Sequence, residues 1–210
     1  VDVSDPSAPV VVGHIDIGPI QNGVFAVGTT VYTSDYYNGM RVFDASDPSA
    51  LSQIGFYDNT DGLYEDLHVI DGVAYLADWN NGLRLIDVSA PQTPVELSTL
   101  SIDGSTTDVR VIGSQAYVTN WSGGLYIVDV SDAAAPSVTH HITTQGNARG
   151  VDVLGGRVYV ADNSSGLHIT DLNLPCEEGE VCLLGDCVSC EPGGVPDLLG
   201  AQCEPCPEGT

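Results

Sequence analysis

Six cysteines carry the most reactive chemistry in this 210-residue chain, and all of them follow Pro175. Their spacing is C-x5-C-x4-C-x2-C-x12-C-x2-C. The last four have the spacing of a zinc ribbon, but a zinc site would leave the first two without a role. An even number of cysteines in a short acidic segment rich in glycine and proline favours disulfides, with all fifteen pairings open. The six are Cys176, Cys182, Cys187, Cys190, Cys203 and Cys206.

The histidines and serines do not form a catalytic pattern. The five histidines occupy unrelated positions, and the sequence has no G-x-S-x-G elbow, H-E-x-x-H motif or phosphate-binding loop. His140 and His141 are neighbours on an expected strand, so their side chains point to opposite faces and are poor joint metal ligands. We therefore expect a non-enzymatic protein with no catalytic residues, no metal ligands and no cofactor.

Acidic and amide side chains recur at two fixed positions in the chain. Short side chains of this kind accept hydrogen bonds from backbone N–H groups in tight turns, which is the role that we favour. The alternative is a set of calcium ligands, although calcium needs six to eight oxygens and the segment Asp58 to Gly62 does not fit an EF-hand loop. The two sets are Asp35, Asp78, Asn120 and Asp162, and Asp44, Asp87, Asp129 and Asp171.

The charge balance excludes several classes of partner. The chain has 29 acidic residues against five arginines and no lysine, which gives a formal net charge of −24. Binding to nucleic acid or to an anionic membrane needs basic side chains, so we expect neither. Apolar residues make up 42% of the chain, too many for a disordered acidic tail. No run of eighteen apolar residues is present, so we expect no membrane insertion in this segment.

An internal repeat indicates where the secondary-structure elements that hold these residues begin and end. The segment GMRVFDASDPSA recurs as GLRLIDVSAPQTP, GLYIVDVSDAAAP and GLHITDLNLP, and a tyrosine always lies seven residues before its first glycine. Equivalent tyrosines are 43, 42 and 42 residues apart. Residues 1–175 are thus four copies of one unit, at about 1–43, 44–86, 87–128 and 129–175, followed by a separate cysteine-rich module at 176–210.

Each unit is expected to form four short strands. Alternation of apolar and polar residues, β-branched enrichment and turn residues every eight to twelve positions all favour strands. We expect the first strand at 24–27, 67–70, 109–112 and 151–154, the second at 73–78, the third at 82–88 and the fourth at 10–17 or 95–102. A four-stranded unit of this length predicts an all-β fold, a β-propeller-like array of antiparallel blades with a small disulfide-rich C-terminal module.

The repeats resemble the LVIVD repeats, a bacterial and archaeal surface family of β-propeller blades. The resemblance is carried by VAYLADWNNGLRLIDVSAP (73–91), QAYVTNWSGGLYIVDVSD (115–132) and RVYVADNSSGLHITDL (157–172). It implies a propeller in an extracellular or cell-envelope setting, and no particular activity. The end of the chain, CEPCPEGT, resembles extracellular cysteine-rich modules of the ephrin-receptor and growth-factor-receptor type.

The sequence leaves three ways for the array of blades to close. The last unit supplies strands one to three only, and residues 10–17 form a fourth strand without the three before it. Pairing the two within one chain would close a four-bladed ring, and the array can equally need further blades. In the third alternative, residues 10–17 complete a blade of a neighbouring chain, which would build a polymer.

Two further sets of residues are candidate sites. One position of the expected inner strand carries a different side chain in every copy. A binding centre would show such variation, and so would a solvated face on which no residue type is required. These candidate channel residues are Phe25, His68, Arg110 and Asp152. The N-x-S/T sequons at Asn120 and Asn163 are candidate glycosylation sites in expected surface turns.

Taken together, these features favour a non-enzymatic extracellular or cell-surface protein with a structural or adhesive role. It would act through protein–protein interaction, with other copies of itself or with other surface proteins as partners, as a subunit of a filament or surface layer. The alternative is a propeller that binds a glycan or calcium at the cell surface.

Overall fold

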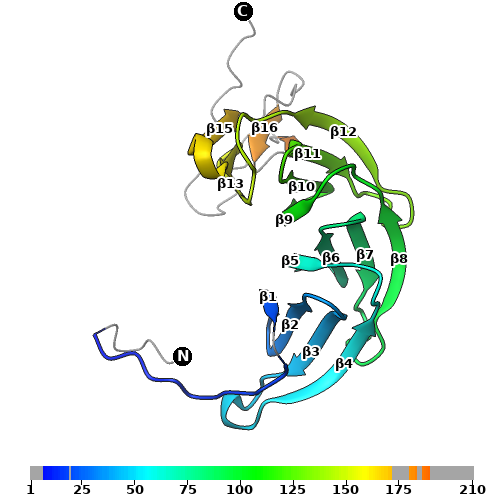
Figure 1. Cartoon of the computed structure of the whole chain (residues 1–210), viewed down its shortest axis with the longest axis vertical. Coiled ribbons are helices and arrows are strands. Elements are labelled where there is room, and N and C mark those ends of the chain that lie inside the picture. The colour runs from blue at the N-terminus through cyan, green and yellow to red at the C-terminus, as the bar shows by residue number, and fades with distance from the viewer. Residues whose placement is uncertain (1–6, 19, 172–179, 184–185, 190–210) are drawn as a thin grey trace, which may run out of the picture.

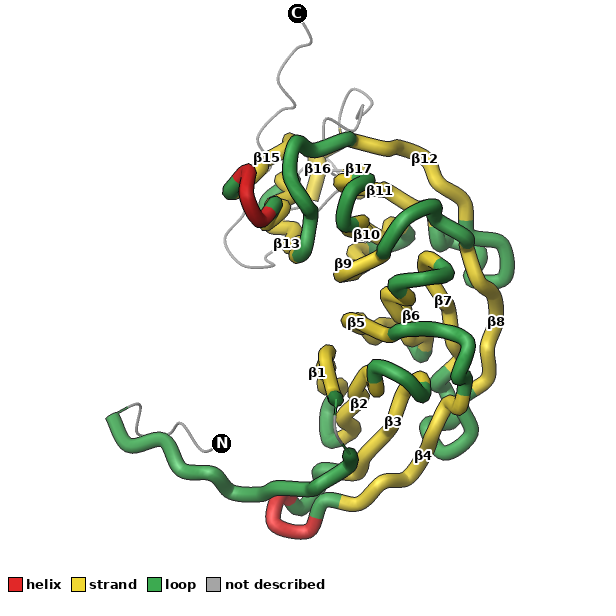
Figure 2. Tube along the Cα trace, in the orientation of Figure 1, coloured by secondary structure: helices red, strands yellow, loops and turns green. Residues whose placement is uncertain are grey.

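The computed structural model describes residues 7–18, 20–171, 180–183 and 186–189. Its main body is an open arc of successive antiparallel sheets, arranged like the blades of a propeller (Figure 1). The first strand of each blade lies on the inner, concave side of the arc, and the fourth strand lies on the convex side (Figure 2). The all-β, propeller-like fold predicted from the repeat is therefore confirmed.

Three blades have four strands in sequence order, and the last has three. Blade 1 contains β1 (Gln21–Val27), β2 (Thr30–Asp35), β3 (Gly39–Asp44) and β4 (Ser52–Asp58). Blade 2 contains β5 (Tyr64–Ile70), β6 (Val73–Asp78), β7 (Gly82–Asp87) and β8 (Val95–Leu100). Blade 3 contains β9 (Thr106–Ile112), β10 (Gln115–Asn120), β11 (Gly124–Asp129) and β12 (Ser137–Ile142). Blade 4 contains β13 (Gly150–Leu154), β14 (Arg157–Ala161) and β15 (Leu167–Asp171). Single 3-10 turns, η1 (Pro48–Ala50) and η2 (Asn163–Ser165), lie between strands.

Turn residues fix the register of the inner hairpins. Asp71 and Gly72, with φ of 50° and 77°, connect β5 to β6. Positive φ at both central residues is what a two-residue hairpin turn needs to match the twist of its strands. Gly82 opens β7 at φ 98°, and a side chain there would collide with the Leu100 carbonyl on the outer strand. These turns hold Ile70 opposite Val73 and Leu83 opposite Leu100.

The apolar cores lie between blades and not within them. The face of each blade that packs on the next blade along the chain is called here its forward face, and the opposite face its backward face. Three buried clusters join blades 1 and 2, blades 2 and 3, and blades 3 and 4. In the second cluster, Leu83 and Leu85 of blade 2 pack with Val109 and Val118 of blade 3, and all four are fully buried. A blade therefore buries both faces only when it has a neighbour on each side.

Two expectations about the repeat need correction. The expected unit boundaries at 43, 86 and 128 fall inside the third strands, because a sequence repeat has no intrinsic phase and hairpin connectivity sets where a sheet begins. Residues 10–17, expected to form a fourth strand, belong to none of the blade sheets, since no third strand lies beside them. The four-bladed ring within one chain is also wrong, because this segment and β15 lie at opposite ends of the arc (Figure 1).

The cysteine-rich module is described only as a backbone hairpin. It consists of β16 (Glu180–Leu183) and β17 (Asp186–Ser189), with Cys182 opposite Cys187 in register. Their side chains are outside the described part of the structure. The remaining cysteines of the predicted disulfide framework lie outside the described residues altogether: Cys176, Cys190, Cys203 and Cys206.

Candidate functional site

The candidate channel residues form a line of contacts from blade to blade along the inner strands. The rings of Phe25 and His68 meet edge to face, with centroids 4.4 Å apart. His68 Nδ1 accepts a hydrogen bond from the backbone N–H of Val111 at 3.2 Å, and Arg110 Nε lies 3.8 Å from Asp152 Oδ1. Burial and the nearby charge of Arg110 lower the pKa of His68 to about 4, so its imidazole is neutral at pH 7. These side chains tie neighbouring blades together at the inner rim.

A pair of carboxyl groups lies beside this line. Asp66 and Asp108 occupy equivalent positions on β5 and β9, and Asp108 Oδ2 accepts a hydrogen bond from the N–H of Val151 at 2.8 Å. Burial, together with the hydrogen bond and the charge of Asp108, raises the pKa of Asp66 to about 8. Asp66 therefore keeps its proton near neutral pH. In blade 1 the equivalent residue is Gly23, and a Cβ there would collide with the Asp66 carboxylate.

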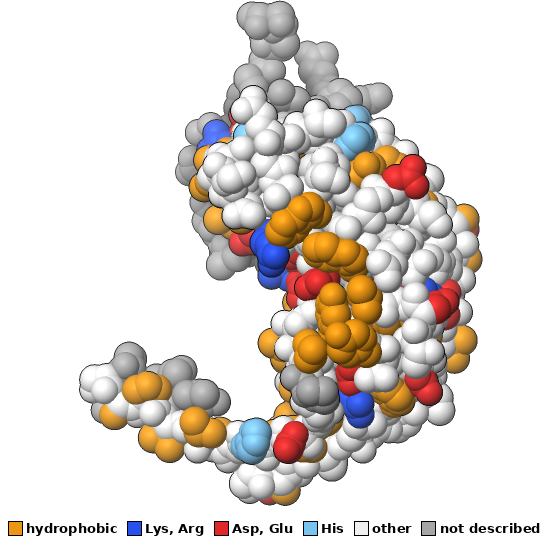
Figure 3. All heavy atoms as spheres, viewed as in Figure 1, with side chains coloured by type: hydrophobic (Ala, Val, Ile, Leu, Met, Phe, Trp, Pro, Cys, Tyr) orange, Lys and Arg blue, Asp and Glu red, His pale blue; other side chains and the backbone are white. Residues whose placement is uncertain are grey.

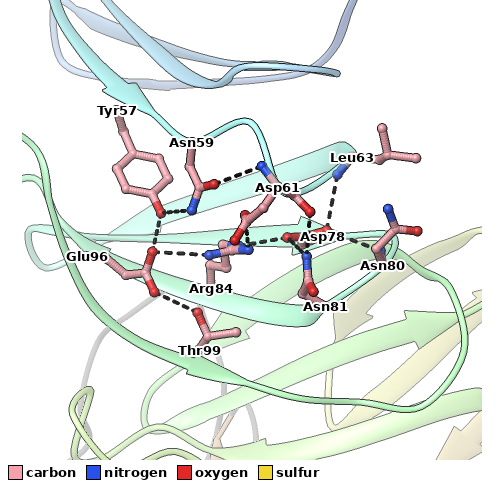
Figure 4. A network of polar contacts seen from close by, with 10 residues as sticks. All are labelled: Tyr57, Asn59, Asp61, Leu63, Asp78, Asn80, Asn81, Arg84, Glu96 and Thr99. Carbon is pink, nitrogen blue, oxygen red and sulfur yellow. Dashed lines mark hydrogen bonds and ion pairs between the residues drawn. The ribbon is translucent and has the colours of Figure 1, made fainter.

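The most connected polar group in the described residues is the Arg84 guanidinium of blade 2 (Figure 4). Arg84 is 4% exposed and pairs with Asp78 Oδ2 at 2.7 Å, Asp61 Oδ1 at 2.6 Å and Glu96 Oε2 at 3.2 Å. Asp78 is fully buried. Tyr57 donates a hydrogen bond to Glu96, and burial together with this bond raises the pKa of Tyr57 to about 12. The network holds β7, β8 and the loop before β5 together, which is a structural role.

The same pairing recurs in three blades and was missed from the sequence. The residue at the end of the second strand lies six positions before its partner in the third strand. Where this residue is an aspartate, the partner is an arginine or a histidine. Blade 3 has an asparagine and a tyrosine at these positions, so both members lose their charge together. The constant D-x5-R/H spacing was the signal that could have revealed it. The pairs are Asp35–Arg41, Asp78–Arg84 and Asp162–His168.

The recurring acids also bond local backbone groups. Asp78 Oδ1 accepts hydrogen bonds from the N–H groups of Leu63 and Asn80 at 3.2 and 3.1 Å, and Asp162 Oδ2 accepts one from Gly146 at 2.7 Å. Three acids of the second set each accept from the N–H two residues on, and the fourth, Asp171, accepts from Arg157 at 2.7 Å. Those three are Asp44, Asp87 and Asp129.

The two sequons have different environments. Asn120 is fully buried, accepts a hydrogen bond from the N–H of Gly123 at 3.1 Å and donates one to the Asp103 carbonyl at 3.3 Å. Its proposed glycosylation is therefore inconsistent with the folded blade, because the amide has no access to solvent. Asn163 is exposed at the tip of the β14–β15 loop, with φ of 42°. It remains a candidate acceptor.

An aromatic row runs along the turns between second and third strands. Tyr36, Trp79 and Trp121 occupy equivalent positions in blades 1, 2 and 3. The Trp79 and Trp121 rings are 5.7 Å apart, and the Arg149 guanidinium lies 4.4 Å above the Trp121 ring. The backbone N–H of each tryptophan is bonded to the loop before the first strand of its own blade, which fixes the row. Partly exposed aromatic rings on a rigid base are typical of binding surfaces.

The two ends of the arc expose the residue positions that form cores elsewhere. Leu167 and Ile169 on the forward face of blade 4 are 62% and 57% exposed, and Val24 on the backward face of blade 1 is 68% exposed. The concave side between these ends is hollow and not filled by described side chains (Figure 3). The same repeat positions are buried at the three internal junctions.

Two features are absent from the described residues. No group of three or more histidine, cysteine, aspartate or glutamate side chains is arranged to hold a metal ion within that part of the chain. Of the helices seen there, none has the length and apolar character needed to cross a membrane.

One known repeat family matches most of this chain. The LVIVD repeat matches residues 1–17, 22–59, 61–101, 103–144 and 145–175, which is most of the chain, so the chain belongs to the LVIVD-repeat family. The first match ends at Ile17, the position equivalent to Asn59 in the next match, and the last stops after the third strand of blade 4. No curated protein matches the chain.

Solved structures with a similar fold include designed and natural proteins. The computationally designed Ika4 protein superposes with a TM-score of 0.64 at 10% identity, over 79% of this chain and 99% of its own. The designed Ika8 protein gives 0.60 at 10% identity, over 72% of this chain and 46% of its own. BamB from Moraxella catarrhalis gives 0.54 at 15% identity, over 70% and 42%. The chain thus spans less than half of the two larger structures.

Proposed function

We propose that this chain is a non-enzymatic structural or adhesive protein of the cell surface that acts through protein–protein contacts. The observation that carries the proposal is the pair of exposed blade faces at the ends of the arc, where Val24, Leu167 and Ile169 stand free. In the three internal junctions the equivalent positions are buried against a neighbouring blade. A surface that is built to be covered favours a protein partner.

The charge distribution supports a protein partner over an anionic one. All five arginines are engaged, four with carboxylates and Arg149 with the Trp121 ring. The remaining surface carries the acidic excess of a chain with net charge −24. Such a surface repels phosphate groups and keeps a protein soluble at high local concentration, as a surface assembly requires.

Labelling of intact cells tests the proposed location and role. Antibodies raised against the folded chain would be applied to intact and to permeabilised cells of the organism that makes it, and examined by immunogold electron microscopy. We expect dense labelling of the intact cell surface. Labelling that appears only after permeabilisation would contradict the proposal.

The aromatic row favours a second candidate function, binding of a glycan at the cell surface. Sugar C–H groups pack on the faces of aromatic rings, and the partly exposed rings of Trp79 and Trp121 lie 5.7 Å apart, with the Arg149 guanidinium over Trp121. Calorimetry with cellopentaose, chitopentaose and xylopentaose would test it. We expect binding of one of these probes to fall at least about tenfold in Trp121→Ala and to be unchanged in Leu97→Ala, a control on β8. Equal binding by both variants, or no binding of any probe, would count against this function.

A further inference from the structure

The forward face of blade 4 is the unfilled copy of an interface that occurs three times in the molecule. Leu125 and Ile127 of blade 3 occupy the same repeat positions as Leu167 and Ile169, and they are 1% and 6% exposed against blade 4. Blade 2 buries Leu83 and Leu85 at these positions in the same way. Leu167 and Ile169 therefore present the shape that a following blade covers.

The backward face of blade 1 is the matching half of that interface. Its Val24 is 68% exposed. The equivalent residues of the next three blades are fully or nearly fully buried against the blade before them. These three are Leu67, Val109 and Val151. The arc thus ends in two different surfaces, one of each kind, and each kind packs on the other at every internal junction.

Residues 10–17 lie where the outer strand of a preceding blade would lie. A Cβ on Gly13 would overlap the carbonyl oxygen of Pro48 in blade 1, just as a Cβ on Gly55 of β4 would overlap that of Pro91 in blade 2. Blade 2 repeats this contact on blade 3, where Ser98 Oγ donates a hydrogen bond to the Ala133 carbonyl at 2.6 Å. The segment therefore lies on blade 1 at the place that the outer strand of a preceding blade would take, and the described residues contain no other strand of such a blade.

The segment fits the edge of β15, which has no fourth strand beside it among the described residues. In blade 3 the outer strand β12 pairs with β11. Ser137 lies opposite Asp129 and, after a bulge, His140 lies opposite Ile127. The same register places Val10 opposite Asp171 and Gly13 opposite Ile169. Val11 and Val12 are 71% and 42% exposed and belong to no strand or bridge, so this part of the segment is open to pairing.

The geometry points to a second copy of this chain as the partner of both ends. Residues 10–17 of one copy add to β15 of the other as its fourth strand, and blade 1 of the first copy packs on blade 4 of the second. This inference rests on the proposed role in protein–protein contact and names the partner and the surface. The interface repeats the rotation between adjacent blades, so a further copy continues the same arc toward a closed ring.

A ring of two copies would have the size of the two larger propeller-like structures, whereas one copy already covers 99% of the Ika4 protein. The described blades correspond to 46% and 42% of the two larger propeller-like structures, so two arcs supply the amount of blade structure in one of those chains. In a ring of two, each copy offers one forward face and one backward face, and both ends of each copy are covered. The edge of β15 is then paired like the third strands of the other blades, and only the inner and outer edges that every blade keeps remain open.

Light scattering on the full chain after size exclusion tests this directly. At about 50 µM we expect a mass twice the 21.9 kDa of one chain. Ile169→Asp and Val24→Asp each place a charge in both junctions of the ring, so each should weaken association by roughly 100-fold or more. Val95→Asp, at an equally exposed position on the convex side of blade 2, is the control and should leave the dimer intact.

Mixing the two end variants separates loss of the interface from loss of folding. An Ile169→Asp chain and a Val24→Asp chain can meet so that one junction carries both substitutions and the other carries neither. We therefore expect the mixture to recover a population of dimers that neither variant forms alone. Recovery requires two folded chains with the polarity described here.

Three results would overturn the inference. They are a monomeric wild-type chain at about 50 µM, end variants that dimerise as the wild type does, and masses that grow without limit as concentration rises. A monomer that still labels the intact cell surface would leave the proposed function standing, because another surface protein would then be the partner. Monomer mass together with labelling only in permeabilised cells would remove both.

Discussion

Gly13 lies directly against the carbonyl group of Pro48, with no space for a side chain between them. The contact joins a segment that belongs to no blade sheet to the outer loop of blade 1. The same contact recurs between blades 1 and 2 and, through a serine hydroxyl, between blades 2 and 3. The N-terminal segment therefore packs on blade 1 in the way that the outer strands of blades 1 and 2 pack on the blades that follow them.

Substitution of the equivalent glycine inside the array should destabilise it. Gly55→Val would push a branched side chain into the Pro91 carbonyl, and we expect the free energy of unfolding to fall by about 1–3 kcal/mol. Urea unfolding followed by tryptophan fluorescence measures this. Ser52→Val, at an exposed position on the same strand, is the control and should change stability by less than about 0.5 kcal/mol. Equal effects of the two substitutions would contradict the close approach.

The Arg84–Asp78 pair should be the most sensitive ion pair in the blades. Arg84→Met leaves the fully buried Asp78 carboxylate without its cation, so we expect a loss of about 3–5 kcal/mol. The matched control is Arg157→Met, which breaks a pair of similar length, 2.7 Å, whose side chains are 57% and 62% exposed. That change should lower stability far less, because solvent screens an exposed ion pair. Thermal unfolding compares the two, and a larger effect at Arg157 would refute the ranking.

Adding Asp78→Asn to Arg84→Met should recover part of the lost stability. The second substitution removes the buried charge that the first one stranded, so the effects of the two changes are not additive. A double variant as unstable as the sum of the single variants would argue against a direct pairing.

Stability should fall with rising pH because of Asp66. Its pKa is raised to about 8 in the folded chain, above the ordinary aspartate value, so the folded state keeps a proton that the unfolded state has released. This contribution is fully present below about pH 4 and is lost as pH rises through about 8, with a slope of up to about 1.4 kcal/mol per pH unit. Asp66→Asn removes the ionisation.

The difference between wild type and Asp66→Asn isolates this group. His68 also titrates in the inner line, with a lowered pKa, but it does so in both proteins. We expect the variant to gain stability relative to wild type as pH increases from 5 to 9, measured by urea unfolding at each pH. Parallel stability curves for the two proteins would show that Asp66 is not protonated in the fold.

The buried sequon asparagine should matter for folding and the exposed one should not. Asn120→Ala leaves the Asp103 carbonyl without its side-chain donor and leaves the Gly123 N–H with the Asn120 backbone carbonyl alone, and we expect a loss of about 1–3 kcal/mol. Asn163→Ala removes an exposed side chain and should be within about 0.5 kcal/mol of wild type. Melting temperatures of the two variants make the comparison, and the reverse order would contradict the placement of both residues.

The strands could be predicted from the sequence because each one carries its own signal. Alternation along β5 and β9 and the turn glycines between strands are local features, and the constant spacing of the tyrosines gave the number of blades. The phase of the blades could not be obtained in this way. The period of a repeat is the same whichever residue is taken as its first. Only the pairing of β4 with β3 shows where a blade ends.

The candidate sites were less predictable because they depend on contacts across blades. Their repeat position predicts that Phe25, His68 and Arg110 lie on the inner strands. Their contacts with the next blade are seen only in the three-dimensional structure. Asn120 matches a glycosylation motif, and only its burial excludes it. The Asp–Arg pairs could have been found, since a six-residue spacing from the end of one strand to the third residue of the next places both side chains at one hairpin.

Images of the full chain at high concentration test the closure by a second copy most directly. Single-particle electron microscopy of the wild type should show closed rings in which two four-bladed arcs meet at two junctions. At each junction, the N-terminal segment of one copy should lie beside β15 of the other. Single open arcs, or rings in which blade 1 meets blade 1, would contradict it.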